Sequence, residues 1–403
     1  MKVLQINTVC GSGSVGRITV DIAHALERAG DACRIAYGRR TAPEGVDSWR
    51  FGTDADMAVH VLHTFFKGEQ GFASGKQTAR LIKEIRQWDP DIIHLHNLHG
   101  FYLDTEQLFG YLRQAGKPVV WTLHDCWAFT GHCAYFDYVG CDKWKTLCHD
   151  CPQHRSAYPY ALFKDNSEQN YLRKKRMLKD QPIPDMTLVT PCRWLAGLVK
   201  QSFLMDYPVR VIYNGIDLSR FHPEAEGDLR ARLGLEGKYV ILGGANMWEK
   251  RKGYPYFLEL AERLGKEYQV ILIGLDKKKL KSLPPGVLGL ARTESVEELA
   301  AYYSMADVYV NATLEDNFPT TNLEALACGT PVITFATGGS VESVDAACGK
   351  IVPKGDLEAL LEAVRELRGE PDKKEACLKR AALYDKYDRF QEYLELYRSL
   401  LKK

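Results

Sequence analysis

The sequence predicts an α/β protein of two domains, each built on a parallel β-sheet with helices on both faces. Short, nearly continuous apolar runs alternate with segments of helical periodicity, which is typical of buried parallel strands and the helices that connect them. The alternation is interrupted near residues 205–217 and restarts at residue 239. The length of 403 residues also favours two domains, because a domain usually holds about 100–200 residues.

The first domain is expected to span residues 1–205. A glycine-rich turn at residues 11–16 follows the first strand, and the next segment places Ile18, Ile22 and Leu26 on one helical face. Residues 126–160 are rich in Cys, Trp, Tyr and His, fit neither periodicity, and are expected to form an irregular insert. The predicted strands of this domain are residues 3–6, 33–37, 91–95, 118–123 and 186–189.

The second domain is expected to span residues 206–385. Its predicted strands are residues 239–244, 270–274, 287–290, 308–311 and 331–335, and its predicted helices are residues 253–264, 296–305, 321–328 and 357–367. Residues 386–403 form a last helix whose apolar side chains share one face and need a partner surface. These side chains are Phe390, Tyr393, Leu394, Tyr397, Leu400 and Leu401.

Composition and charge exclude several classes of protein. With 45% hydrophobic and 26% charged residues, the chain is not expected to be disordered, collagen-like or a coiled coil. The formal charge of +1 argues against a nucleic-acid partner, although the first half is mildly basic, which hints at an anionic surface. No apolar run reaches the roughly 20 residues of a membrane helix, and the N-terminus lacks signal-peptide features. We therefore expect a cytoplasmic protein.

The first candidate motif is Gly11-Ser-Gly-Ser-Val-Gly16, which matches G-x-G-x-x-G between a strand and a helix. A dinucleotide site would also need an acidic residue at the end of the second strand, but that strand runs into Tyr37-Gly-Arg-Arg40. Three interpretations stay open: an NADP site that uses the arginines, a loop for another anion or substrate, and a tight turn without a ligand.

The second candidate motif runs from Asp316 to Val332, after a strand and into a helix. The amides of residues 318–321 could receive a diphosphate at the helix N-terminus, and Glu324 could accept hydrogen bonds from ribose hydroxyls. Alternatively, Thr321 and Glu324 have the spacing of a capping box, which would make Glu324 only a helix cap. Asp316 would face the same ligand, or only favour the helix dipole.

Further motifs follow in a fixed order along the chain. They are Asp91-Ile-Ile-His-Leu-His-Asn97, Thr122-Leu-His-Asp125, Thr190-Pro-Cys-Arg-Trp-Leu-Ala196, Val211-Ile-Tyr-Asn-Gly-Ile-Asp217 with Phe221-His-Pro223, Lys250-Arg-Lys-Gly253 and Thr337-Gly-Gly-Ser-Val-Glu342. With the Asp316 and Glu324 pair, this set resembles the retaining family-4-type glycosyltransferases of the GT-B fold and their E-x7-E signature. Asp316 stands in the first acidic position, and Phe318-Pro319 replaces the usual Phe-Gly.

The resemblance implies two Rossmann-like α/β/α domains facing a central crevice, with the C-terminal helix crossing back to the N-terminal domain. The first domain would serve the acceptor and the second the nucleotide sugar. It further implies transfer of a hexosyl-type sugar from a UDP- or GDP-sugar to a saccharide or lipid-linked saccharide, with retention of configuration and without a catalytic metal or other cofactor. The implied setting is bacterial exopolysaccharide or lipopolysaccharide assembly, with peripheral contact between the N-terminal domain and the inner face of the membrane.

The resemblance also assigns roles to residues. Lys252 would contact the donor phosphates, and His124 would lie beside the transferred sugar, unless it is only a strand-end histidine bonded to backbone. The family often has Arg at the position of Asn246, so the resemblance supplies no second phosphate-binding cation there. The implied catalytic residues are His124, Lys252, Asp316 and Glu324. The implied donor-binding residues are Gly13, Asn246, Arg251, Lys252, Phe318, Pro319, Thr320, Thr321 and Glu324. The implied acceptor-side residues are Gly11, Gly16, Arg17, His96 and Asp125.

Four cysteines of the insert, Cys133, Cys141, Cys148 and Cys151, have the number and residue type of a structural zinc site. Only the last two have C-x2-C spacing, and His132, His149 or His154 could substitute for a ligand. We expect one structural zinc here, with reduced packed cysteines and an iron–sulfur cluster as alternatives.

Two other functions compete with the glycosyltransferase. One is an NADP-dependent oxidoreductase that uses residues 11–16, and the other is a zinc-containing adaptor that binds a protein through the insert. The oxidoreductase leaves the motifs of the second domain unexplained. Hydrolysis of a nucleotide-sugar donor to free nucleotide would distinguish the glycosyltransferase from both.

Overall fold

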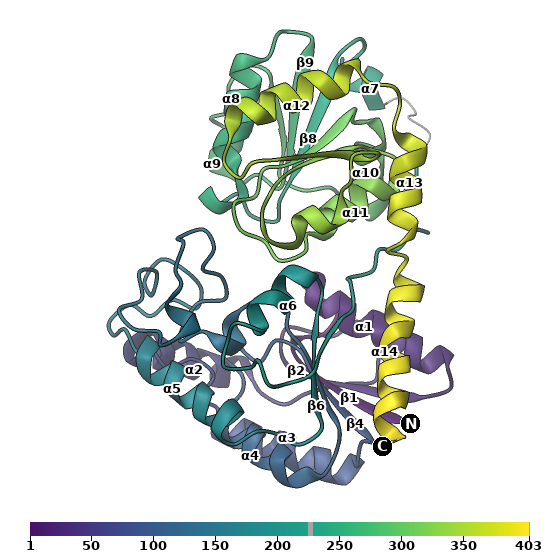
Figure 1. Cartoon of the computed structure of the whole chain (residues 1–403). Coiled ribbons are helices and arrows are strands. Elements are labelled where there is room, and N and C mark those ends of the chain that lie inside the picture. The colour runs from purple at the N-terminus through teal and green to yellow at the C-terminus, as the bar shows by residue number, and fades with distance from the viewer. Residues whose placement is uncertain (225–228, 403) are drawn as a thin grey trace. The chain divides into compact units, whose positions relative to one another are not determined.

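The computed structural model describes residues 1–224 and 229–402, and the chain folds into two compact units (Figure 1). Unit 1 comprises Met1–Tyr213 together with the segment from Arg389 onward, and unit 2 comprises Asn214–Asp388. Each unit holds one parallel β-sheet with connecting helices, so the predicted α/β class is confirmed.

Unit 1 contains seven parallel strands in the order β3-β2-β1-β4-β5-β6-β7. They are β1 (Lys2–Val9), β2 (Ala32–Arg39), β3 (Ser48–Arg50), β4 (Ile92–Leu95), β5 (Val119–Thr122), β6 (Met186–Thr190) and β7 (Val209–Val211). The five predicted strands form the inner sheet. The sequence did not reveal the edge strands β3 and β7, because each has three residues and no buried one, which leaves no apolar run to detect.

The helices of unit 1 are α1 (Gly13–Arg28), α2 (Asp54–Lys67), α3 (Gly75–Trp88), α4 (Thr105–Ala115), α5 (Ser167–Lys175), α6 (Arg193–Val199) and, from Arg389 onward, α14 (Lys386–Leu401). The insert at 126–160 is irregular, as predicted, and its regular structure is limited to the short 3-10 turns η1 (Trp127–Phe129) and η2 (Lys143–Lys145). A π-turn, η3 (Arg176–Asp180), extends α5.

Helix α14 completes the core of unit 1. Phe390, Leu394 and Tyr397 are buried in one apolar cluster with Ile22 and Leu26 of α1. The hydroxyl of Tyr397 lies 2.6 Å from Nδ1 of His94 in β4, which anchors the helix to the sheet. Leu401, placed on the same face by the sequence, is exposed instead. The apolar face of this terminal segment therefore belongs to the core of the first unit.

Unit 2 contains six parallel strands in the order β10-β9-β8-β11-β12-β13. They are β8 (Tyr239–Gly244), β9 (Tyr268–Ile273), β10 (Val287–Leu290), β11 (Val308–Asn311), β12 (Val332–Phe335) and β13 (Gly349–Val352). Its helices are α7 (Leu229–Arg232), α8 (Tyr254–Arg263), α9 (Lys277–Leu280), α10 (Val296–Met305), α11 (Thr320–Ala327), α12 (Leu357–Gly369) and α13 (Lys374–Ala382), with 3-10 turns η4 (Lys250–Lys252) and η5 (Gly338–Ser343). The edge strand β13 was not predicted.

Strand order fixes where a ligand can bind in each unit. In unit 1 the chain leaves β1 toward β2 on one side, while β4 lies on the other side of β1. In unit 2, β8 has the same relation to β9 and β11. In open α/β sheets, ligands bind at the carboxyl ends of the strands at such a switch point. The segments that follow β1, β4 and β5 in unit 1, and β8, β11 and β12 in unit 2, are therefore the places to look for functional groups.

Candidate functional site

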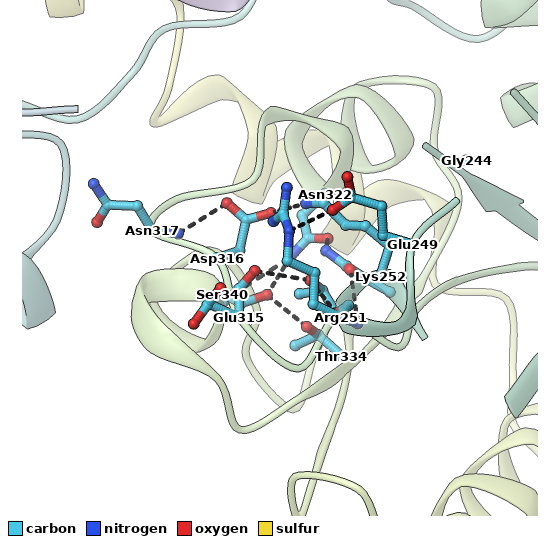
Figure 2. Close-up of polar contacts among 12 residues, drawn as sticks. Gly244, Glu249, Arg251, Lys252, Glu315, Asp316, Asn317, Asn322, Thr334 and Ser340 are labelled. Carbon is cyan, nitrogen blue, oxygen red and sulfur yellow. Dashed lines mark hydrogen bonds and ion pairs between the residues drawn. The ribbon is translucent and has the colours of Figure 1, made fainter. Parts of the chain in front are cut away.

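The structure brings Lys252 and Asp316 of unit 2 together. Lys252 ends the 3-10 turn η4, and Asp316 lies in the loop between β11 and α11. The Nζ of Lys252 lies 2.5 Å from Oδ2 of Asp316, and Oδ1 of Asp316 accepts a hydrogen bond from the backbone N–H of Asn317 (Figure 2). Both charged side chains are partly exposed, at 25% and 18%. A cation is thus held in place beside a helix N-terminus and remains accessible to a ligand.

Two glycines allow the loops around this pair to pack closely. Gly253 has a φ of +77°, and a Cβ there would lie 2.0 Å from the carbonyl oxygen of Ala312. Gly338 has a φ of +53°, and a Cβ there would lie 1.9 Å from the carbonyl oxygen of Asp316. Any other residue would be strained and would collide with backbone. The two glycines therefore fix the positions of η4 and of the loop that carries Asp316.

The N-terminus of α11 differs from the predicted capping box. The N-cap residue is Pro319, no side-chain cap is present, and Thr321 lies inside the helix, so the alternative interpretation of Glu324 as only a helix cap is excluded. The helix begins earlier than a cap at Thr321 would allow, because proline readily adopts the extended φ of an N-cap. Pro319 has no N–H, so the first helical N–H groups at this end are those of Thr320 and Thr321.

Glu324 lies one turn into α11 and is 8% exposed. Its Oε2 accepts a hydrogen bond of 2.9 Å from the buried hydroxyl of Tyr303, and its Oε1 lies 3.4 Å from the hydroxyl of Thr320. Burial, followed by the nearby carboxylate of Glu324, raises the pKa of Tyr303 well above its usual range, so this hydroxyl stays protonated and donates. Glu324 is thereby held in a fixed orientation, which suits recognition of vicinal hydroxyls.

Asn322 ties the start of α11 to the segment after β12. Its Nδ2 lies 3.1 Å from the hydroxyl of Ser340 and 3.0 Å from that of Ser343, and its Oδ1 accepts from the amide of Asn311 at 2.8 Å. The hydroxyls of Thr334 and Ser340 are also in contact (Figure 2). This buried network makes the α11 N-terminus, the Thr337–Glu342 motif and β12 one rigid piece.

Of the other predicted donor residues, Arg251 lies beside Lys252 in η4 (Figure 2). Asn246 is exposed, and the guanidinium of Arg251 is paired with Glu249 at 2.8 Å. Phe318 is buried and its ring packs against Tyr384 at a centroid distance of 5.7 Å, so this residue shapes the loop through its side chain. Gly13 lies in unit 1, where it opens α1 and is exposed.

In unit 1, histidines gather where β4 and β5 end. Nδ1 of His96 lies 3.0 Å from Nε2 of His124, and Nε2 of His99 lies 2.7 Å from Oδ2 of Asp125. Burial lowers the pKa of His124 to about 4, and it lowers the pKa of His96 well below its usual range. Burial alone would raise the pKa of Asp125, but His99, the N–H of Trp127 and His124 together lower it, so the carboxyl stays ionised. At neutral pH, His124 and His96 are thus neutral and Asp125 is negative.

The glycine-rich turn of unit 1 closes on itself. The N–H of Gly11 donates to the carbonyl of Gly16 at 2.9 Å, and the α1 N-cap residue Ser12 makes no side-chain cap. Arg40, directly after β2, places its guanidinium 3.2 Å from the hydroxyl of Ser12. Arg17 is exposed and Gly16 is buried. The turn therefore presents the N-terminus of α1 next to a cation, which suits an anionic or polyhydroxyl ligand.

The structure does not support the predicted zinc site. Cys133, Cys141, Cys148 and Cys151 line one small cavity as free thiols, but no three His, Cys, Asp or Glu side chains within the described residues are arranged to hold a metal ion. The thiols of Cys133 and Cys151 pair with each other, and Sγ of Cys148 accepts from the N–H of Gly131 at 3.2 Å. The rings of Phe129, Phe136 and Trp144 pack together beside them and give the insert an apolar core of its own.

Tyr303 and Gln5 contribute to these groups, and sequence patterns did not reveal either residue. Tyr303 is separated from Glu324 by 21 positions, and Gln5 is separated from His96 by 91. Tyr303 lies on the buried side of a helix and Gln5 on the buried side of a strand. The sequence shows each of them only as a polar residue among apolar neighbours. In the part of the chain that the structure covers, no helix combines the length and the apolar character required to cross a bilayer.

Comparison with known families yields two matches. Residues 15–220 match the model described as Glycosyltransferase Family 4, and residues 238–369 match the model described as Glycosyl transferases group 1. Together these matches cover most of both units.

Individual proteins are similar over the full length. The chain is 24% identical to WcaC of Escherichia coli (strain K12), a glycosyl transferase assigned to colanic acid biosynthesis, over 99% of this chain and 100% of that protein. The fold resembles that of a glycosyltransferase from Rickettsia africae, with a TM-score of 0.73 at 15% identity over 100% and 99% of the two chains. It also resembles HepE of Anabaena, solved with UDP, with a TM-score of 0.68 at 15% identity over 99% and 100%.

Proposed function

The chain belongs to the glycosyltransferase family 4 enzymes and has the GT-B fold, and from this premise we propose how it acts on a nucleotide-sugar donor. The family assigns the reaction class, which is transfer of a sugar from a nucleotide sugar. This assignment accounts for both units, whereas an NADP-dependent oxidoreductase would account only for the turn at 11–16. The donor base, the stereochemistry and the acceptor are our proposals.

We infer that the donor diphosphate binds in unit 2 at Lys252 and at the backbone amides of the α11 N-terminus. The single observation that carries this inference is the Lys252–Asp316 pair beyond the end of β11, next to a helix N-terminus that lacks a side-chain cap. As the bond from the sugar to the diphosphate breaks, negative charge grows on the departing phosphate. A fixed cation and aligned amides stabilise that charge more in the transition state than in the ground state. Lys252 supplies the positive charge at this position.

Glu324 is proposed to bind the ribose hydroxyls of the same donor. Its buried, oriented carboxylate accepts from Tyr303 and can accept further, because each carboxylate oxygen has two lone pairs. Uracil is the base we favour, since HepE was solved with UDP. Binding of UDP, GDP and ADP by calorimetry would identify the base. A clear preference for a nucleotide other than UDP would overturn this choice.

We predict retention of the anomeric configuration. The motivation is the Asp316 and Glu324 pair, spaced as in the retaining enzymes that the sequence resembles, together with Lys252. The test is proton NMR of the purified product made from a donor of known anomeric configuration. A product with the same configuration as the donor agrees with the prediction, and an inverted linkage contradicts it.

The proposed acceptor is a saccharide or lipid-linked saccharide in bacterial surface-polysaccharide assembly, since WcaC is assigned to colanic acid biosynthesis.

An exposed apolar patch on unit 1 fits peripheral contact with a membrane. It is formed by Val59, Leu62 and Phe66 of α2 with Leu162 and Phe163. Phe66 and Phe163 are 58% and 66% exposed, and their rings stack at 4.9 Å. Exposed lysines, Lys67 and Lys164, directly follow the two rings. An apolar face flanked by cations is typical of proteins that rest on anionic bilayers.

We predict that replacing both Phe66 and Phe163 by serine abolishes most binding to anionic vesicles. The wild-type protein should sediment with phosphatidylglycerol-containing vesicles and much less with phosphatidylcholine vesicles. The affinity of the double variant for the phosphatidylglycerol-containing vesicles should be lower by about tenfold or more. Leu383→Ser removes an equally exposed apolar side chain from unit 2 and serves as the control. Absence of vesicle binding by the wild type, or a concentration-dependent dimer that the double variant abolishes, would contradict the membrane assignment.

A further inference from the structure

A chain of hydrogen bonds links Gln5, His96 and His124 across three neighbouring strands of unit 1. Gln5 lies within β1, His96 directly follows β4, and His124 follows β5 by two residues. The strands β1, β4 and β5 are adjacent in the sheet, so the three side chains form a row at its carboxyl edge. Oε1 of Gln5 lies 3.0 Å from Nε2 of His96, and Nδ1 of His96 lies 3.0 Å from Nε2 of His124.

The amide of Gln5 sets the direction of this chain. Its Nε2 lies 2.8 Å from the backbone carbonyl of Thr19, which can only accept, and 3.3 Å from Sγ of Cys33. The amide nitrogen therefore points to Thr19, and the amide oxygen points to His96. That oxygen has no proton to give, so Nε2 of His96 must carry the proton that joins them. Gln5 is 0% exposed and His96 is 1% exposed, so neither side chain is in contact with bulk solvent.

The protonation of His96 then determines that of His124. His96 is buried and its ring centroid lies 4.0 Å from that of His94, and both conditions disfavour a second proton on the imidazole. A neutral ring that is protonated at Nε2 has a lone pair at Nδ1. His124 must therefore donate from its Nε2 to Nδ1 of His96, and a neutral His124 has its lone pair at Nδ1.

We propose that Gln5 and His96 are positioning residues that hold His124 in the Nε2–H tautomer, so that its Nδ1 receives a hydrogen bond from a hydroxyl group of the sugar. The proposal rests on the assignment of His124 to the transferred sugar. It excludes a role in which His124 donates a proton from Nδ1 to a carbonyl or an oxyanion. Sugar hydroxyls are donors as well as acceptors, so they satisfy this requirement.

Charged neighbours do not reverse the arrangement at neutral pH. The charged or titratable groups that interact with His124 include Asp125, His99 and His96, from the segments after β4 and β5, and His94 within β4. Asp125 favours a protonated His124, but burial has the larger effect and lowers the pKa of His124 to about 4. The carboxylate of Asp125 is also engaged by His99 at 2.7 Å. A neutral His124 with a fixed tautomer is therefore maintained through the neutral range.

The direct test is imidazole nitrogen NMR of the full-length protein, with the His124 signals assigned from their loss in His124→Gln. We expect the signature of a protonated nitrogen at Nε2 and of a lone pair at Nδ1. In His96→Leu the tautomer signal should shift toward a mixture. In His96→Gln it should be kept, because the amide can accept from His124 and donate to Gln5. If His96→Leu does not fold, Gln5→Leu interrupts the same row of hydrogen bonds at its other end.

Kinetics provide the second readout. His96→Leu and Gln5→Leu should each lower kcat by about 10- to 100-fold with little change in the donor KM, by analogy with the loss seen when a group that orients a metal-bound histidine is removed. His96→Gln should restore most of the loss. A Nδ1–H signature in the wild type, or an unchanged tautomer in both leucine variants, would overturn the proposal. If instead the tautomer is as expected but His124→Gln keeps full turnover, His124 does not act on the sugar. The role of Gln5 and His96 in holding the His124 tautomer would still be supported.

Discussion

Replacement of Lys252 by alanine should lower turnover by about 100- to 1000-fold while donor binding changes less. The reason is that this ammonium group would meet negative charge that grows on the diphosphate only as the sugar leaves. Loss of one fixed donor to such an anion typically removes about 3–4 kcal/mol of transition-state stabilisation. Turnover and donor KM, measured by release of free nucleotide, would separate the two effects.

The main alternative is that Lys252→Ala acts through folding. The Lys252–Asp316 pair is partly exposed, so its loss should destabilise the protein by only about 1 kcal/mol or less, which thermal unfolding would detect. Lys250→Ala is the matched control, because Lys250 lies in the same 3-10 turn and is exposed. It should keep wild-type kinetics. A folded Lys252→Ala variant with turnover within roughly twofold of wild type would show that the diphosphate binds elsewhere.

Replacement of Glu324 by alanine should weaken donor binding by about 10- to 100-fold. A hydrogen bond to a charged group contributes about 1.5–3 kcal/mol, and Glu324 is proposed to accept from the ribose hydroxyls. The donor affinity of Glu324→Gln should lie between those of the wild type and Glu324→Ala, since the amide oxygen still accepts from Tyr303 but the charge is lost. Calorimetric titration with UDP would measure the affinities directly.

Tyr303→Phe distinguishes recognition of the donor by Glu324 from orientation of Glu324 by Tyr303. It removes the hydroxyl that holds Glu324 and leaves the carboxylate in place. We expect a modest loss of stability, about 1 kcal/mol, and a loss of donor affinity smaller than that of Glu324→Ala. Equal losses of affinity in both variants would indicate that Glu324 acts mainly through the buried contact. Unchanged affinity in Glu324→Ala would exclude it from the donor site.

Most of the inner sheet could be predicted because buried parallel strands leave continuous apolar runs, such as residues 119–121 of β5, which are all buried. The edge strands β3, β7 and β13 could not, because they are short and none of them has a continuous run of buried residues. Thr321 and Glu324 have the spacing of a capping box, but the N-cap residue is Pro319, two residues earlier. The zinc prediction counted thiols correctly, but their number says nothing of how the sulfurs are arranged.

The two α/β units, the family and the identity of the chemical groups at the strand ends could be predicted from the residues alone, because each of these leaves a local motif or a local periodicity. Which of these groups lie in contact became known only from the folded chain. Lys252 pairs with Asp316 across 64 positions, and Gln5 orients His96 across 91. Both contacts depend on strand order, which places β1 beside β4 and β8 beside β11. Strand order is fixed by packing of the whole sheet and its helices, and it leaves no signal in the residues that flank any one motif.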